Sequence, residues 1–143
     1  MTQAQGSDIL HASCVALDGR GLLIIGPSGS GKSALALRLM ALGAQLVADD
    51  RTEVTRAGAG VIARCPAAIS GLIEARGIGI LRAKPLEQAR LDLVVDLGRV
   101  ETERLPQHRV ITVLGATIDL VLATQSDHFE ASLCCYLRGG RQD

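Results

Sequence analysis

The amino-acid sequence predicts one α/β domain, in which a mixed β-sheet is flanked by helices. An apolar run, a glycine-rich loop and a helical segment follow one another directly over residues 22–42. Hairpin signals elsewhere in the chain add antiparallel strands to this unit. The 143 residues suffice for one domain with a buried core, and no repeat or low-complexity linker divides them. We therefore treat 1–143 as a single domain, with residues 1–7 as a flexible tail.

The first elements are two strands joined by a tight turn. Ser13–Leu17 alternates as a strand does, and Asp18–Gly21 (D-G-R-G) is a turn signal. Leu22–Ile25 is continuously apolar, which is typical of a strand buried on both faces. A helix is predicted over Ser33–Leu42, where leucines recur at helical spacing, and Gln45–Ala48 is the next strand.

The rest of the chain alternates between strand and helix signals. The predicted strands are a hairpin pair and two single strands: Glu53–Arg56, Val61–Arg64, Leu91–Leu97 and Val110–Leu114. Ile118–Ala123 and Phe129–Leu137 are predicted as helices. Asp127 and Glu130 fit the two ends of a capping box for the second of these helices.

The composition excludes several classes of protein. The 15 basic and 15 acidic residues cancel, which argues against a nucleic-acid binder and against a polybasic membrane-surface protein. No apolar run approaches the ~18 residues of a membrane span, and the N-terminus lacks a signal-peptide pattern. The charge balance and the absence of a span therefore predict neither nucleic acid nor membrane as partner. The four cysteines show no CxxC spacing, so we expect buried thiols in a reducing cytoplasm.

The clearest motif matches GxxxxGK[ST] in full, between a buried strand and a helix, as a phosphate-binding loop requires. It consists of Gly26, Pro27, Ser28, Gly29, Ser30, Gly31, Lys32 and Ser33. Glycines let successive N–H groups point at phosphate oxygens, and the helix N-terminus adds to the positive field. Lys32 would bind the β- and γ-phosphates, and the Ser33 hydroxyl would bind Mg²⁺.

Two apolar strands end in an acid that could complete the site. Asp49 and Asp50 follow the strand after the loop's helix, and a right-handed crossover brings that strand end beside the loop. Neighbouring side chains on an extended chain point in opposite directions. One acid could therefore meet the magnesium shell while the other faces an acceptor hydroxyl; a solvated turn or a helix cap is the alternative. Asp96 lies farther along the chain and is interpreted as a strand-end carboxylate.

A third group of candidates lies in the segment G-L-I-E-A-R-G-I-G-I. Glu74 and Arg76 are two residues apart and on a strand would face the same side. They could reach one phosphate–metal centre, or they could form an ordinary cross-strand salt bridge. His11 precedes the first strand, and a lone histidine is more often a surface or core residue.

In this order and spacing, the chain resembles the catalytic domain of HPr kinase/phosphorylase, from about His11 to about Thr124. That bacterial enzyme phosphorylates a serine of the phosphocarrier protein HPr and can reverse the reaction with inorganic phosphate. The segments that carry the resemblance are His11, Asp18–Gly21, Gly26–Ser33, Val47–Asp50 and Glu74–Ile80.

The resemblance implies a role for each matching residue. Lys32 would bind the phosphates, and Ser33 and Glu74 would hold Mg²⁺. Asp50 would be the general base toward the acceptor serine, with His11 close to it. Arg104 would stabilise the transferring phosphoryl group, and Asp49 and Arg76 would support the site. The implied cofactors are ATP and Mg²⁺, the implied partner is HPr or a related carrier, and the implied assembly is a homo-hexamer.

The family's larger members carry an additional N-terminal domain, and we expect this chain to be the compact form without it. The family has basic residues in a stretch tied to dephosphorylation, whereas Val113–Thr117 has none. Reverse phosphorolysis is therefore an open alternative.

Two other functions also remain open. One is a small-metabolite kinase, in which Arg51 and Arg56 could belong to a lid. The other is a nucleotide-binding regulatory module without transfer activity.

Overall fold

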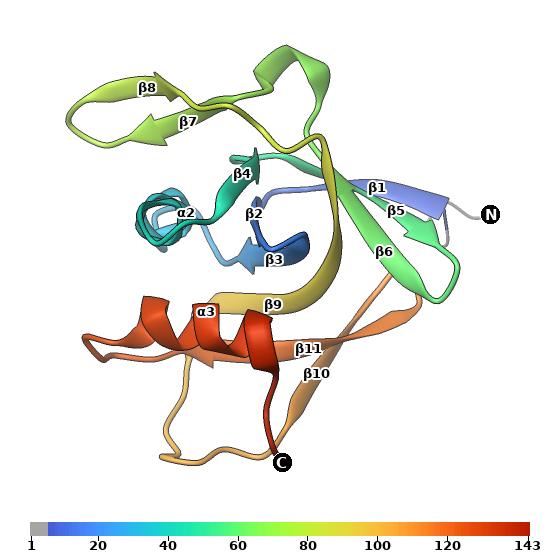
Figure 1. Ribbon diagram of the computed structural model, residues 1–143, viewed down its shortest axis with the longest axis vertical. Helices are drawn as coiled ribbons and strands as arrows, with labels where there is room; N and C mark the ends of the chain where they lie inside the picture. The colour runs from blue at the N-terminus through green and yellow to red at the C-terminus, as the bar shows by residue number, and fades with distance from the viewer. Residues whose placement is uncertain (1–5) are drawn as a thin grey trace.

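The computed structural model describes residues 6–143 of the chain, as a curled nine-stranded mixed sheet, a two-stranded hairpin and two helices (Figure 1). The elements in the first half are β1 (Ser7–Leu10), β2 (Ser13–Leu17), β3 (Arg20–Ile25), α2 (Lys32–Ala41), β4 (Gln45–Ala48), β5 (Thr52–Ala57), β6 (Gly60–Arg64) and the 3₁₀ turn η1 (Ala67–Ile69). Those in the second half are β7 (Leu72–Ala75), β8 (Gly79–Arg82), β9 (Gln88–Val100), β10 (Arg109–Val113), β11 (Ala116–Ala123) and α3 (Phe129–Gly139).

The long strand β9 organises the sheet. The order is β1-β5-β6-β9-β3-β2-β4, and β9 also pairs with β11, which in turn pairs with β10. The pairs β9–β3 and β9–β11 are parallel, while the other pairs in the sheet are antiparallel. The predicted fold class, a mixed sheet with flanking helices, is therefore confirmed.

The core lies on both faces of the sheet. On one face, α2 and α3 pack on β2 and β3 through residues such as Leu35, Leu39 and Leu133 (Figure 1). The other face is enclosed by the curl of the sheet itself and includes Val54 and Leu120. β2 and β3 contribute side chains to the core on both faces of the sheet, and this explains why their sequences are almost continuously apolar.

The predicted strands in the first half are confirmed within one or two residues, and so are the first helix and α3. The prediction of a helix over Ile118–Ala123 is wrong. This segment lies in β11, and the residues of that strand alternate between buried and more exposed positions. β11 is held between β9 and β10, and this pairing overrides the local apolar pattern.

The predicted capping box of α3 is also wrong. The N-cap is His128, which makes no side-chain capping bond, and Glu130 lies 3.9 Å from Arg38 of α2 instead.

The N-terminal prediction is wrong in part. Residues 1–5 lie outside the described residues, but Ser7, assigned to the flexible tail, begins β1 and pairs with Thr55 of β5. The segment Ile73–Leu81 is a hairpin, with β7 and β8 joined by a turn at 76–78. Within residues 6–143, neither helix is long and apolar enough to cross a membrane.

Candidate active site

The glycine-rich loop joins β3 to α2 in a conformation that depends on its glycines. Gly26 has φ +151°, and a Cβ at this position would lie 2.6 Å from Ser30 Oγ. Gly31 is the N-cap of α2 and is left-handed, with φ 98° and ψ 24°. The helix therefore starts at Lys32, with its N-terminal N–H groups directed toward the loop. The start of a helix with free N–H groups is a natural anion site.

Lys32 folds back over this loop. Its Nζ donates to the carbonyl oxygens of Gly26 at 2.8 Å and Pro27 at 3.1 Å, and the residue is only 7% exposed. A buried ammonium needs such partners. The two carbonyl contacts hold the positive charge at the mouth of the loop, where a phosphate would bind.

Asp49 connects three segments of the chain. Its Oδ1 accepts hydrogen bonds from Ser33 Oγ and from Ser13 Oγ, both at 2.7 Å. Its Oδ2 accepts the backbone N–H of Glu74 at 3.1 Å. The carboxylate is 6% exposed, so these donors compensate its burial. The expectation that the end of this strand lies beside the loop is confirmed, and Asp49 is the member of the acid pair that contacts the loop's serine.

Asp50 contacts a different partner from those of Asp49. Its Oδ1 lies 2.8 Å from His11 Nε2, and the two side chains are 62% and 53% exposed. Its φ is +70°, an unusual value for a residue other than glycine. The backbone is held there by the N–H of Ala12, which donates to the Asp50 carbonyl at 3.1 Å. Residues separated by 39 positions thus form an exposed His–Asp pair.

A cavity of about 660 Å³ brings the candidates together. Its lining includes His11, Lys32, Ser33, Asp50 and Glu74. One wall is the start of α2 with the loop, and the opposite wall is the β7–β8 hairpin.

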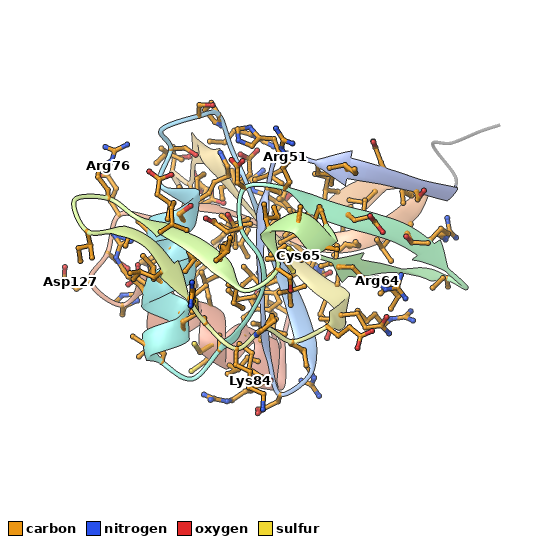
Figure 2. All side chains as sticks on the ribbon, turned by 90° about the horizontal axis from the view of Figure 1, so that it is seen from above. Arg51, Arg64, Cys65, Arg76, Lys84 and Asp127 are labelled. Atoms are coloured by element: carbon orange, nitrogen blue, oxygen red, sulfur yellow. The ribbon has the colours of Figure 1, made fainter. Side chains whose placement is uncertain are left out.

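Arg76 also lines this cavity. The expectation that it lies on a strand with Glu74 is wrong. It lies in the turn of the β7–β8 hairpin and projects outward from it (Figure 2). The backbone N–H of Glu74, bound to Asp49, ties this hairpin to the site.

Arg104 is not brought to this cavity. It is exposed on the connection between β9 and β10, which lies in Figure 1 on the opposite side of β9 and β11 from α2. Asp96 accepts the backbone N–H of Gly98 at 2.8 Å, as a strand-end carboxylate does.

The charge of Asp49 acts on the thiol of Cys65. Burial, and after it the negative charge of Asp49, raises the pKa of this thiol, so it stays protonated. Burial likewise raises the pKa of Cys14 in β2 to about 12. Both are thiols rather than thiolates at neutral pH. The expectation of buried thiols is confirmed for Cys14 and Cys134, but Cys65 is only partly buried, and the expectation is wrong for Cys135, which is exposed.

The oxygen donors in the cavity are suited to Mg²⁺. Ser33 Oγ donates its proton in the hydrogen bond to Asp49, so the lone pairs of the serine oxygen can bind a cation. Glu74 offers an exposed carboxylate in the same cavity. Mg²⁺ is commonly held by one or two protein oxygens, with phosphate and water completing the shell. The described residues contain no group of three or more His, Cys, Asp or Glu side chains placed for a metal.

One residue of the site was missed by the sequence analysis. Ser13 looks like an ordinary strand residue, but it is fully buried and bonded to Asp49. The available signal was a hydroxyl at the start of a strand whose other four residues, Cys14–Leu17, are apolar.

Comparison with known proteins places this geometry in a family. A family model described as "HPr Serine kinase C-terminal domain" matches residues 3–120. A protein of Aromatoleum aromaticum named HPr kinase/phosphorylase is 42% identical, over 76% of this chain and 39% of its own length. One of the same name from Cupriavidus metallidurans is 40% identical, over 78% of this chain and 38% of its own. The chain thus spans about two fifths of these relatives.

A solved structure agrees with the sequence relatives. The Hpr(Ser) kinase/phosphatase from Coxiella burnetii superimposes with a TM-score of 0.76 at 26% identity, covering 92% of this chain and 94% of that chain. The matched residues run from the N-terminal region into β11 and so include the loop, the acid pair and the β7–β8 hairpin. The chain therefore belongs to the HPr serine kinase C-terminal domain family.

Proposed function

We propose that this chain is an ATP- and Mg²⁺-dependent kinase that phosphorylates a serine of HPr or of a related phosphocarrier protein. The observation that carries the proposal is the shared cavity: His11, Lys32, Ser33, Asp50 and Glu74 come from four separate segments and line one space. Phosphoryl transfer to a hydroxyl needs a phosphate-binding loop, a metal-binding oxygen set and a proton acceptor near the γ-phosphate. Each requirement has a residue here.

Nucleotide binding falls to the loop and Lys32. The N–H groups of the loop and of the first turn of α2 hold the phosphate oxygens. Lys32 exchanges its contacts with the carbonyls of Gly26 and Pro27 for the β- and γ-phosphates. The ammonium already lies at the loop before nucleotide binds.

Ser33 and Glu74 hold the metal in this proposal. When bound, Mg²⁺ neutralises charge on the β- and γ-phosphate oxygens. Asp49 keeps the Ser33 hydroxyl in place through its 2.7 Å hydrogen bond. The same carboxylate holds the backbone of Glu74, so both metal-binding residues are oriented by one buried acid.

Asp50 acts on the acceptor. Its carboxylate takes the proton of the serine hydroxyl as that oxygen bonds to the γ-phosphorus. The bond between the γ-phosphorus and the β–γ bridging oxygen breaks, and the products are phosphoserine and ADP. His11, 2.8 Å away, holds the carboxylate in position.

The exposure of this pair favours a protein acceptor. Side chains that are 62% and 53% exposed lie at an open surface, where a serine on another protein can reach them. Enzymes for small metabolites usually enclose the substrate in a pocket. Arg51 is exposed, and Arg56 donates to the carbonyls of Gly58 and Leu114, so the structure does not support a lid formed by these arginines.

Arg104 can act on the phosphoryl group only if the segment that carries it moves. For the role that the resemblance implies, the exposed connection between β9 and β10 has to approach the cavity when nucleotide or carrier binds. Assembly as a homo-hexamer and a cytoplasmic location also remain proposals from the resemblance; light scattering after gel filtration measures the first.

The test is a phosphotransfer assay with γ-labelled ATP, Mg²⁺ and a purified HPr-like carrier, followed by mass spectrometry of the labelled residue. Label on a carrier serine supports the proposal. Label on a small molecule indicates a metabolite kinase, and no transfer despite nucleotide binding indicates a regulatory module. Incubating the phosphorylated carrier with inorganic phosphate, and measuring release of pyrophosphate, tests reverse phosphorolysis separately.

A further inference from the structure

The buried hydroxyl of Ser13 has no role in the reaction described above. Among the described residues, the buried polar or charged ones are Ser13, Lys32, Asp49 and Thr52. Lys32 and Asp49 belong to the site, and Thr52 Oγ1 donates to the Ala12 carbonyl at 2.9 Å. Ser13 is 0% exposed, at the start of a strand whose other residues are apolar. A hydroxyl in such a place needs a partner, and its partner is Asp49.

Strand pairing places this hydroxyl. β2 lies between β3 and β4 in the sheet, and Cys14 pairs with Ala48 in antiparallel register. Ser13 precedes Cys14 and Asp49 follows Ala48, so the hydroxyl and the carboxylate lie next to this last pair, where the two strands end. Ser13 Oγ donates to Asp49 Oδ1 at 2.7 Å.

The same oxygen also faces Asp50. The backbone N–H of Asp50 points to Ser13 Oγ at 3.4 Å. The preceding residues hold Asp50 as well, through the Ala12 N–H on its carbonyl and the His11 ring on its carboxylate. Three consecutive residues thus fix an acid pair whose second member has the unusual φ of +70°. Ser13 is the one of the three that touches both acids.

Asp49 Oδ1 is shared by two hydroxyls. Ser13 supplies one of them and Ser33 the other. With Ser13 present, Oδ1 is tied to β2 by one hydroxyl and receives the Ser33 hydroxyl of α2 as the other. Without that donor, the carboxylate keeps only the Ser33 hydroxyl and the backbone N–H of Glu74, and the orientation of the Ser33 hydroxyl is less tightly fixed.

We infer that Ser13 is a positioning residue for the metal–nucleotide site, acting through Asp49 on Ser33 and through the backbone on Asp50. The inference rests on the proposed function for its link to phosphoryl transfer. It concerns how the chain orients its metal-binding hydroxyl, and it assigns no contact between Ser13 and the substrate.

The test compares three variants with the wild type. Ser13→Ala removes the donor, and Ser13→Thr keeps it on a side chain suited to a strand. Thr52→Val is the matched control, since it also removes a fully buried hydroxyl and one hydrogen bond but does not touch Asp49. The readouts are the Mg²⁺ midpoint for transfer and the calorimetric affinity for a non-hydrolysable ATP analogue, with and without Mg²⁺.

For Ser13→Ala we expect the Mg²⁺ midpoint to rise by about 10- to 100-fold, the usual effect of removing a group that orients a metal ligand. Affinity for the analogue without Mg²⁺ should be unchanged, and the gain in affinity on adding Mg²⁺ should shrink. Ser13→Thr should restore the wild-type midpoint, and Thr52→Val should lower the melting temperature without moving the midpoint.

An unchanged midpoint in Ser13→Ala would overturn the inference, and so would an equal shift in Thr52→Val. Should Ser13→Ala not fold, Ser13→Cys, with its weak donor, replaces it in the same comparison. If the wild type binds the Mg²⁺–analogue but transfers phosphate to no acceptor, the proposed function fails, while the Mg²⁺ dependence of binding still decides the role of Ser13.

Discussion

Replacement of Asp50 by asparagine removes the proposed proton acceptor and almost nothing else. The side chain keeps its size and still reaches His11. Asparagine also tolerates the left-handed backbone at this position, where φ is +70°. Alanine would instead add about 1–2 kcal/mol of backbone strain there. The asparagine variant therefore separates proton transfer from folding.

The expected magnitude follows from where the carboxylate lies. Because the Asp50 side chain is 62% exposed, its replacement should leave the free energy of unfolding within about 0.5 kcal/mol of the wild type. Loss of a general base lowers a rate by about 10²- to 10⁴-fold. At about 1.4 kcal/mol per tenfold, the barrier rises by about 3–5.5 kcal/mol.

The assay measures the single-turnover rate of transfer from labelled ATP to the carrier, together with the affinity for the ATP analogue. Asp50→Asn should bind the analogue as the wild type does and transfer phosphate far more slowly. A single-turnover rate close to that of the wild type would refute the assignment of Asp50 as the base. Equal losses of binding and transfer would place Asp50 in the nucleotide site instead.

Three further predictions concern other parts of the molecule. Lys32→Ala should abolish nucleotide-dependent transfer and weaken binding of the ATP analogue in calorimetry, because the loop loses its buried cation; binding equal to that of the wild type would contradict this. Glu74→Gln should raise the Mg²⁺ midpoint for transfer while leaving binding without Mg²⁺ unchanged, and an unaltered midpoint would remove Glu74 from the metal shell. Hydrogen bonds from Arg109 hold the pKa of the Glu101 carboxyl below its usual 4.5, so its stabilising contribution is present above that value and is lost as the pH falls through the lowered pKa. Urea unfolding at neutral and acidic pH should therefore show a smaller acid-induced loss for Glu101→Gln than for the wild type, and equal losses would contradict the ion pair.

The first half of the fold could be predicted because its signals are local. The apolar run before the loop, the glycines within it and the leucine spacing after it each specify one element. The C-terminal half depends more on distant partners. β11 is a strand because β9 and β10 pair with it, and the I-D-L-V-L-A segment alone fits a helix as well.

The site residues also fall into two groups: those that local patterns predict and those that only strand pairing places. The loop and the acid pair were predictable, since they follow a known spacing and a strand end. That Asp49 rather than Asp50 meets Ser33 depends on the register between β2 and β4, which the sequence does not display. Ser13 was missed for the same reason. Arg104 lies on a connection that local patterns could not place, and the structure keeps it away from the cavity.

A crystal structure of the chain with Mg²⁺ and a non-hydrolysable ATP analogue would show the reacting groups of the kinase mechanism together. We expect the terminal phosphate within about 3 Å of Lys32 Nζ. We also expect the Asp50 carboxylate to face that phosphate, with room between them for a serine oxygen about 3–3.5 Å from the phosphorus. A terminal phosphate on the far side of the loop, or an Asp50 carboxylate turned away from it, would contradict the kinase mechanism.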